Sequence, residues 1–511
     1  MKSRGEVSVK RRCAGSGGVL CLIVFGLSAC GQEKQREDRP KAPPTQLAQA
    51  ARSNSPTPAR NLKSLDRVSL HGKPKSLPAG ALTHDWTSFL GPTHNSISTE
   101  TKLLKKWPEG GPTLVWEMEK GTSYSSPAIA GEYLVFPHRI DGDVIVECLH
   151  PETGGSHWQF RIPTEYRDRY GYNNGTRSSP VIDGDRVYVY TAASKLFCLQ
   201  LANGQVLWQR DVQQDYKVPQ DFFGTAATPL LSGRNLIINV GAPNGPCVAA
   251  FDKLTGKTAW TANANGWGPS YSSAVPATIH GKQRVFVLAG GDSDPPTGGL
   301  ISLDPADGKV DFTFPFRSES YESVNASCPV VVGNQVFISA SYEQGSALLT
   351  IGPDMRHRPA WTTKEVGLHW NTAVHKDGHF YAFDGRNEPD ASLVCVELKT
   401  GKVVWREVPE WQEAVDYQGQ SLKLDVSTYR GSLLRVDDRF LCLGELGHLM
   451  WLDLSPQGYK LIQRDWLFFS KETWALPVLS RGLLYVTQNK RDLVSRKAPR
   501  LLCYDLRGEA E

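Results

Sequence analysis

The sequence predicts an all-β protein whose main domain is an eight-bladed β-propeller. Two observations predict this fold: a small-residue turn followed by a short apolar run recurs along the chain, and most copies are followed by a hairpin phrase that ends in an aromatic residue. Apolar runs such as RVYVY and LFCLQL are too short for helices and are rich in β-branched and aromatic residues. The repetition indicates a radial or stacked array rather than one enzyme domain with a single set of catalytic loops.

In each hairpin phrase a glycine is followed, four residues later, by a large aromatic residue. The pairs are Gly154–Trp158, Gly204–Trp208, Gly256–Trp260, Gly308–Phe312 and Gly401–Trp405. A Thr-Gly, Asn-Gly or Asp-Gly pair suits a tight hairpin because glycine accepts a positive φ. The aromatic residue then lies on the outgoing strand, where we expect it to pack against the neighbouring copy. These side chains, with Trp361, are therefore predicted to form a structural girdle between blades.

The spacing of the repeat predicts the number of blades. The first four glycines of the phrase are 50, 52 and 52 residues apart, and the next gap of 93 leaves room for a degenerate copy around residues 348–361. A period of this length fits four short strands, which is a propeller blade and not a solenoid repeat. The eight innermost strands are predicted to begin near Ser125, Ser178, Ala227, Ser272, Ser327, Asn371, Gly431 and Trp474. Seven blades are the alternative.

The two ends of the predicted domain complete each other. The last copy, which begins near Trp474, runs out at Glu511 without its outer aromatic strand, and a spare strand, PTLVWEME, lies at residues 112–119. Pairing the spare strand with the last blade would close the ring and remove two open edges. The sequence therefore predicts closure between the segment around Trp116 and the final blade.

Residues 1–29 are predicted to be a lipoprotein signal peptide. A basic start is followed by the apolar run GVLCLIVFGL, which is too short for a transmembrane helix, and the segment ends in LSAC at Cys30. Small residues before a cysteine resemble the bacterial lipobox, in which the cysteine is diacylated, so Cys30 is the predicted lipidation site. Two acyl chains would supply a stable anchor. An ordinary secretory signal is the alternative.

Residues 30–80 are predicted to be a disordered tether, residues 81–111 a lead-in segment, and residues 112–511 the propeller. The tether is rich in Pro, Ser, Gln and Ala and poor in large apolar residues. Removing the five basic and one acidic residues of the signal peptide from the totals of 57 and 53 leaves 52 of each. A net charge of zero argues against nucleic acid as a partner.

The phrase AFDKLTGKTAW and its copies resemble the PQQ-type (pyrroloquinoline quinone) propeller repeat, with its Ala-x-Asp-x-x-Thr-Gly-x-x-x-Trp pattern, over residues 110–507. The lead-in is similar to that of PQQ-like propeller proteins of planctomycete-type bacteria. A lipobox joined to such a propeller resembles the BamB family of outer-membrane assembly lipoproteins. The resemblance implies a periplasm-facing binding or scaffold protein of the cell envelope, and its finer implication is a role in outer-membrane protein assembly. Gly31 after the lipidated cysteine resembles the sorting pattern for the outer membrane.

A PQQ-dependent alcohol or sugar dehydrogenase is the first alternative function. In that class, two adjacent cysteines cover the quinone, a tryptophan stacks beneath it, and acidic residues bind Ca²⁺. This chain has ten cysteines but no adjacent pair. Trp267 or Trp370 could stack on a quinone, and Asp292, Asp294 or Asp390 could bind Ca²⁺, although the aspartates are more simply turn residues. We therefore expect no enzyme activity, no cofactor and no metal site, since CxxC, HExxH, GxSxG and P-loop patterns are also absent.

The cysteines of the predicted mature chain other than Cys30 are expected to be structural. Cys148, Cys198, Cys395 and Cys503 occupy the same place in different copies, just before the hairpin. They are predicted to be small buried apolar residues within strands.

The loops before each innermost strand are predicted to form the working surface, because they converge on the central channel of a propeller. Aromatic rings with a few arginine, asparagine and histidine side chains suit a ligand or peptide site. A carbohydrate-binding propeller is the third alternative. His369 is the titratable group with catalytic potential, but the sequence shows no partner for it. The expected partner is a protein or polymer of the envelope, and the protein is expected to be a monomer. The candidate residues are Tyr124, Tyr172, Asn173, Arg177, Phe223, Trp267, Tyr271, Asn325, His369, Trp370, Asn371, Tyr429, Arg430 and Trp474.

Overall fold

The computed structural model of the chain describes residues 65–388, 390–417 and 419–508. The predicted signal peptide, Cys30 and the tether up to residue 64 lie outside the described residues. Strands form nearly all of the regular structure, and α1 (Val212–Tyr216) is a single helical turn after one outer strand. None of the helices in the described part is long and apolar enough to span a bilayer.

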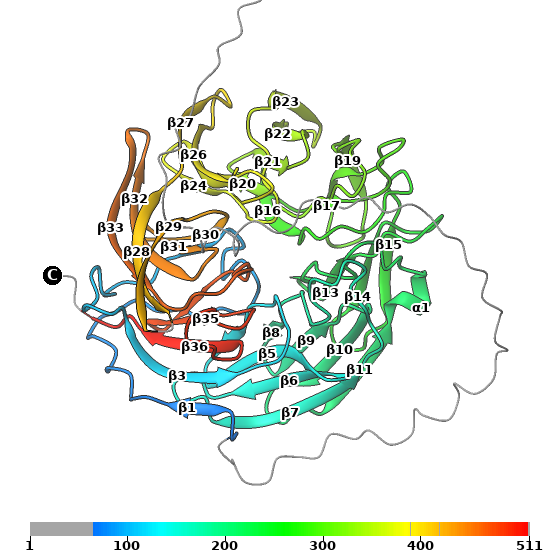
Figure 1. Ribbon diagram of the computed structural model, residues 1–511. Helices are drawn as coiled ribbons and strands as arrows, with labels where there is room; N and C mark the ends of the chain where they lie inside the picture. Colours follow the sequence, from blue (N-terminus) through cyan, green and yellow to red (C-terminus); the bar gives the residue numbers. More distant parts are fainter. Residues whose placement is uncertain (1–64, 389, 418, 509–511) are drawn as a thin grey trace, which may run out of the picture. The chain divides into compact units, whose positions relative to one another are not determined.

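Eight antiparallel sheets surround a central axis (Figure 1), which confirms eight blades and excludes seven. Blades 1 to 6 each consist of four consecutive strands, as expected from short apolar runs joined by turns. Blades 1 to 3, each given from the innermost strand outward, are β4 (Ala128–Ala130), β5 (Tyr133–Ile140), β6 (Asp143–Leu149) and β7 (Ser156–Pro163); β8 (Val181–Asp183), β9 (Arg186–Tyr190), β10 (Lys195–Gln200) and β11 (Val206–Asp211); and β12 (Leu230–Ser232), β13 (Asn235–Asn239), β14 (Val248–Asp252) and β15 (Thr258–Ala262).

The next three blades repeat the pattern, including the degenerate copy predicted near residues 348–361. Blades 4 to 6 are β16 (Val275–Ile279), β17 (Lys282–Ala289), β18 (Gly299–Leu303) and β19 (Val310–Pro315); β20 (Val330–Val332), β21 (Gln335–Ala340), β22 (Gly345–Ile351) and β23 (His357–Thr363); and β24 (Val374–Lys376), β25 (His379–Asp384), β26 (Ser392–Glu397) and β27 (Val403–Glu407).

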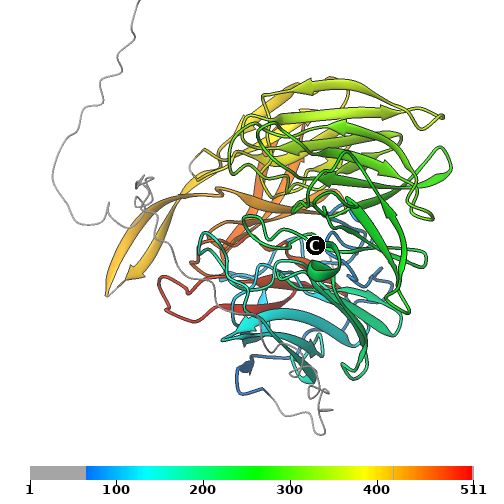
Figure 2. The same cartoon turned by 90° about the vertical axis from the view of Figure 1, so that its right-hand side faces the viewer.

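Blade 7 contains an addition that the repeat did not predict. A hairpin, β28 (Glu410–Tyr417) and β29 (Gln420–Ser427), precedes it, forms its own two-stranded sheet, and extends away from the ring in Figure 2. The strand β2 (Ile97–Ser98) from the lead-in pairs in parallel with the innermost strand. The remaining strands of blade 7 are β30 (Gly431–Val436), β31 (Arg439–Gly444), β32 (His448–Ser455) and β33 (Gly458–Trp466).

Blade 8 closes the ring as predicted. It combines β34 (Val478–Ser480), β35 (Leu483–Thr487) and β36 (Arg500–Asp505) with β3 (Thr113–Glu119) and β1 (Val68–Leu70). Trp116 of β3 lies opposite Cys503 of β36, so residues almost 400 positions apart in sequence share one sheet. The pairing covers the edges that each end of the domain would otherwise expose.

Neighbouring blades are joined by a repeated contact between a tryptophan and a glycine. The indole N–H of Trp208 in blade 2 donates to the carbonyl oxygen of Lys253 in blade 3 at 3.0 Å, and the ring covers Gly256. A Cβ atom at Gly256 would lie 2.6 Å from that ring, and φ there is +71°. The hairpin glycine is therefore needed both for its positive φ and for room.

This tryptophan–glycine contact recurs around the ring and confirms the predicted girdle. The outer tryptophan stacks on the hairpin glycine of the next blade and donates to a carbonyl oxygen beside it. Four further copies are Trp116 on Gly154, Trp158 on Gly204, Trp260 on Gly308 and Trp361 on Gly401. Each of these five contacts removes a large ring from water and satisfies its polar N–H, so it contributes to stability at its seam.

The cysteines also lie where the repeat predicted. Cys148, Cys198, Cys395 and Cys503 each lie directly opposite the girdle tryptophan of the same sheet. All seven cysteines in the described part of the chain are buried and free, and burial raises the pKa of the Cys198 thiol to about 11. They act as small apolar residues, as predicted.

The lead-in crosses the end of the ring at which the innermost strands finish, and we call this end the lead-in face. Trp86 exchanges backbone hydrogen bonds with Ile129 in blade 1, and the amide of Ile182 in blade 2 donates to Thr87. Glu100 accepts from the amide of Gly482 in blade 8 at 2.7 Å. With β2 on blade 7, the lead-in thus ties four blades together, and Trp86 is fully buried.

The sequence was wrong about the last part of the tether. Residues 67–82, which we call the strap, run along blade 8, where β1 pairs with β3 and the amide of Lys75 donates to Asp505. Arg67 forms an ion pair with Glu147, which is fully buried beside His138. Burial raises the pKa of Glu147, but the bonds from His138 and Arg67 outweigh it and hold that pKa below its ordinary value. Composition cannot register backbone pairing with a distant strand, which is why it assigned these residues to the tether.

Candidate binding site on the channel face

The end of the ring at which the innermost strands begin is the channel face, and six of the predicted aromatic residues lie there in one cluster. The ring of Trp474 lies 5.0 Å from that of Tyr124 and 6.2 Å from that of Trp370, between ring centroids. Phe223 lies 5.5 Å from Tyr271. Tyr172 joins the two groups, because its ring is 6.3 Å from Trp474 and 6.0 Å from Phe223. We call these six residues the aromatic cluster.

Two arginines stack on the cluster and are held there by carboxylates. Arg177 lies 5.1 Å from the centre of the Tyr124 ring and forms an ion pair with buried Asp168. Arg430 lies 5.0 Å from the Trp474 ring and forms a two-bond contact with Glu445, at 2.6 and 2.9 Å. Cation–π contacts of this kind favour a fixed arrangement of rings and guanidinium groups. The two predicted arginines therefore organise the cluster.

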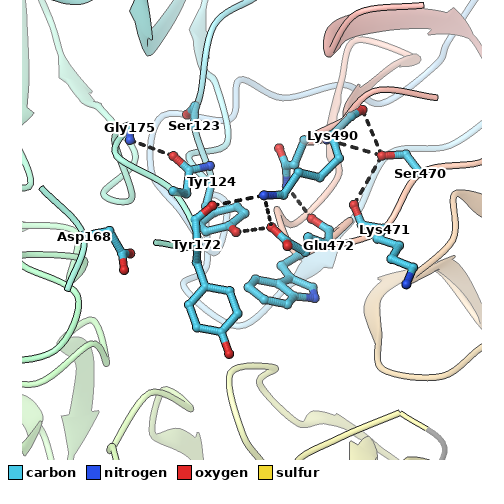
Figure 3. Close-up of polar contacts among 12 residues, drawn as sticks. Ser123, Tyr124, Asp168, Tyr172, Gly175, Ser470, Lys471, Glu472 and Lys490 are labelled. Carbon is cyan, nitrogen blue, oxygen red and sulfur yellow. Dashed lines mark hydrogen bonds and ion pairs between the residues drawn. The ribbon is translucent and has the colours of Figure 1, made fainter. Parts of the chain in front are cut away.

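Polar contacts fix the blade 8 side of the cluster (Figure 3). The hydroxyl of Tyr124 donates to Glu472, and the ammonium of Lys490 lies 3.3 Å from the same carboxylate. Lys490 also donates to the backbone carbonyl of Tyr172 at 3.0 Å. Burial and the Glu472 charge raise the pKa of Tyr124, so its phenol stays protonated. The loops of blades 1, 2 and 8 are thereby tied together.

His369 is half-buried and neutral. Its Nε2 atom lies 3.0 Å from the hydroxyl of Tyr342, which is the partner that the sequence did not reveal. Burial, with the charges of Arg430 and Arg386, lowers the pKa of His369 to about 3. The imidazole is therefore uncharged at neutral pH and acts as a hydrogen-bonding group.

Three predicted asparagines hold loops in place. The Asn173 side chain accepts from the amide of Gly175 at 2.6 Å. Asn325 donates to the carbonyl oxygens of Ala289 and Phe316. Asn371 exchanges hydrogen bonds with the backbone of Phe383. All three are buried, so their side chains shape the loops beneath the channel face.

Two of the predicted aromatic residues, Trp267 and Tyr429, lie outside the aromatic cluster. Trp267 is buried in the core that blades 3 and 4 share, so it is not available to a ligand. Tyr429 is half-buried with a positive φ, and its amide donates to Ser427 in the loop after the β28–β29 hairpin. Position before an innermost strand predicts the loop correctly, but it does not determine the direction of the side chain.

Sequence reasoning missed a second group of aromatic side chains beside the cluster. Tyr170 and Tyr321 are 39% and 70% exposed, and both pack on Phe222. Tyr170 also lies against Phe223, as the predicted Tyr172 does. The Tyr170 hydroxyl donates to Glu322 at 2.8 Å, which joins the loop before blade 2 to the loop before blade 5. The segments RDRYGYNNG and SESYES carry the signal, since aromatic residues within long polar loops are unusual.

The channel face thus combines fixed ion pairs, a neutral histidine and exposed tyrosine rings. Two buried nitrogen atoms, Nε1 of Trp370 and Nδ1 of His369, have no hydrogen-bond partner among the described residues. Tyrosine, tryptophan and arginine are the side chains enriched at protein interfaces and at their energetic centres. The channel face therefore has the residue composition that is typical of protein interfaces.

The fold and the repeat define a PQQ-like eight-bladed propeller. A family profile described as outer membrane protein assembly factor BamB matches residues 141–407, which is just over half of the chain. The chain belongs to this family.

A curated relative and several solved structures are similar to the chain. BamB of Nitrosomonas eutropha is 28% identical over 159 residues, which is 31% of this chain and 34% of that protein, so the chain matches about a third of that relative. The crystal structure of BamB from Moraxella catarrhalis has a TM-score of 0.50 at 15% identity and covers 77% of this chain and 98% of that one. The quinohemoprotein alcohol dehydrogenase of Comamonas testosteroni has a TM-score of 0.56 at 11% identity, with 84% and 81% covered. At these identities the solved structures show the fold alone.

The residues considered for a quinone and Ca²⁺ do not come together in one site among the described residues. Trp267 is in the core, and Trp370 has the Trp474 ring 6.2 Å away. Asp292 closes a turn with Thr297 through two hydrogen bonds, and Asp294 lies within that turn. Among the described residues, no three His, Cys, Asp or Glu side chains come close enough together to hold a metal ion. No residue of the channel face is therefore assigned a role in quinone chemistry.

Proposed function

We propose that this protein is a lipid-anchored, periplasm-facing scaffold that binds a protein partner through its channel face during outer-membrane protein assembly. The aromatic cluster with the exposed tyrosines beside it is the observation that carries the proposal. Membership of the BamB family supports the cellular role, and the LSAC segment at Cys30 supports the anchor and an outer-membrane location. We propose further that the protein acts as a monomer and needs no cofactor.

The contacts within the site favour binding over catalysis. Arg177, Arg430 and Glu472 are already engaged with partners inside the protein, and His369 is neutral. A general acid or base needs a pKa near the working pH, and the pKa of His369, about 3, is far below it. Burial raises the pKa of Glu445 to about 7, but this carboxyl is enclosed and already accepts two bonds from Arg430. Exposed rings on rigid loops instead offer contact area at low cost in conformational entropy.

A photo-crosslinking side chain at Tyr172 tests the proposal in cells. We expect adducts with envelope proteins of outer-membrane assembly, identified by mass spectrometry. The same crosslinker at Leu254, in the turn between β14 and β15 of blade 3, is the control, since that side chain is 44% exposed. Equal amounts of adduct from both positions, or no adduct from Tyr172, would show that the channel face does not bind the protein partner. Mass spectrometry of the mature N-terminus tests acylation of Cys30 separately.

Two alternatives keep their own tests. The dehydrogenase alternative is supported by the likeness in fold to quinohemoprotein alcohol dehydrogenase, and dye-linked oxidation of alcohols after addition of PQQ and Ca²⁺ would establish it. The carbohydrate-binding alternative is motivated by the exposed tyrosines, because sugar rings stack on aromatic faces. Binding to a glycan array that disappears in a Tyr172→Ala variant would establish that alternative in place of protein binding.

A further inference from the structure

The strap carries an unusual group of exposed side chains. Leu70, Leu77 and Leu82 are between 42% and 64% exposed, and they are interleaved with the exposed residues Lys73 and Lys75. The chain contains no acidic residue between Arg67 and His84. Segments that lie in a membrane interface are typically rich in leucine and lysine and poor in acidic residues. Their apolar side chains enter the lipid, and their ammonium groups contact the headgroups.

Long-range contacts gather part of the strap with the end of the lead-in. The amide of Lys75 donates to Asp505, its carbonyl accepts from Arg507, and the amide of Gly508 donates to the carbonyl of Lys102. Leu82 exchanges hydrogen bonds with Thr101. Lys75, Leu82 and Lys102 therefore lie around the end of β36. Lys73, Lys75 and Lys102 form no ion pair with any described residue.

This region lies at the opposite end of blade 8 from the channel face. The innermost strand of that blade, β34, begins after Trp474 on the channel face and finishes at Ser480. Ser480 donates to the carbonyl of His84 in the lead-in, and Asp505 lies opposite Leu483 at the same end of the sheet. A surface that touches the strap at Lys75 therefore leaves the aromatic cluster free on the other face.

We infer that the strap is a membrane-contact surface for anionic lipid, formed by Leu70, Leu77, Leu82, Lys73, Lys75 and Lys102. The chain enters the described structure at residue 65, and the strap then runs along β3 from the end near Glu119 toward the end near Thr113, beside Asp505. The lysines complement an anionic surface, and the leucines supply apolar area that enters the interface. The strap would thus orient the scaffold with its channel face away from the bilayer. The inference extends the proposed function, whose lipid anchor keeps the strap near a membrane.

Vesicle binding without the lipid anchor tests the strap alone. The probe is residues 30–511 with Cys30→Ser, which cannot be acylated, mixed with vesicles of phosphatidylglycerol and phosphatidylethanolamine. We expect binding that is weaker on phosphatidylcholine vesicles and that falls as salt rises. Replacing Leu70, Leu77 and Leu82 by serine should lower the partition coefficient about tenfold or more. Lys73→Gln should lower it about fivefold.

The control replaces two leucines of similar exposure by serine: Leu207 and Leu461, which lie on the outermost strands β11 and β33 and are each 39% exposed. The control should bind vesicles like the parent chain. No binding by the parent, or equal losses in the strap and control variants, would overturn the inference. Loss of crosslinks to a protein partner in the strap variant, with vesicle binding intact, would reassign the surface to protein. If mass spectrometry shows that Cys30 is not acylated in cells but the strap still binds vesicles, the inference holds and the lipid anchor of the proposed function is wrong.

Discussion

The seams between blades and the channel face are built from the same kinds of side chain but follow opposite rules. At the seams, one contact is repeated: a tryptophan covers the glycine of the next hairpin and donates to a carbonyl beside it. On the channel face, Tyr124, Phe223, Trp370 and Trp474 occupy related places before the innermost strands, but each makes different contacts. The comparison teaches that aromatic residues that recur with the repeat hold the ring together, whereas those that do not recur give this protein its binding surface.

The largest expected effect is at the closing seam. Trp116→Ala removes a fully buried ring, its hydrogen bond to the Pro151 carbonyl and its contact with Gly154. We expect a loss of about 3–5 kcal/mol in the free energy of unfolding. Urea denaturation followed by tryptophan fluorescence measures it. Tyr321→Ala is the control, because Tyr321 is an exposed residue of the channel face. A smaller loss in Trp116→Ala than in this control would break the comparison.

The next effect tests the glycine side of a seam. In Gly308→Ala the new Cβ atom would lie 2.4 Å from the Trp260 ring, at a φ of +76°. We expect a loss of about 2–4 kcal/mol from the clash and the backbone strain together. Gly281→Ala is the matched control, because φ is +75° and nothing lies within 4 Å, so about 1 kcal/mol is expected. Equal losses in the two variants would show that the tryptophan contact is unimportant.

The third effect lies on the channel face and depends on pH. The pKa of His369 is about 3 in the folded protein and 6.5 in the unfolded chain, so the unfolded state binds more protons between these values. Stability from this group is complete above pH 6.5 and falls as the pH drops toward 3. Between pH 8 and pH 5 the loss is about 2 kcal/mol. In His369→Gln this part of the pH dependence should be absent, as measured by urea denaturation of both proteins at the two pH values. Parallel pH profiles would contradict the neutral, half-buried histidine.

The smallest effect on stability is expected at the most exposed part of the aromatic cluster. Tyr172→Ala removes a ring that is 45% exposed, so the free energy of unfolding should change by about 0.5 kcal/mol or less. If the cluster is the binding surface, the same change should lower capture of the partner identified by crosslinking about tenfold or more. Comparing thermal unfolding with capture separates the two effects. A stability loss as large as that of Gly308→Ala would place Tyr172 among the structural aromatic residues.

The sequence by itself determined the ring. Glycine and aromatic residues at a fixed separation predicted the hairpins, the seams, eight blades and the closing strand around Trp116, because each depends on local turn geometry and on a contact that repeats with the chain. The same logic placed Cys148 and its counterparts inside the strands. Position before an innermost strand also identified all six members of the aromatic cluster, although it included Trp267, whose side chain turns into the core.

Only the tertiary structure decided which loops meet and where the chain ends attach. Tyr342 beside His369, Glu472 beside Tyr124, and β1 on β3 join residues that are far apart in sequence. No local pattern records such a contact, because its free energy comes from two segments that become neighbours only after the ring has closed. The β28–β29 hairpin was missed because it interrupts the repeat. The strap was missed because it is ordered by pairing with β3, the strand that closes blade 8.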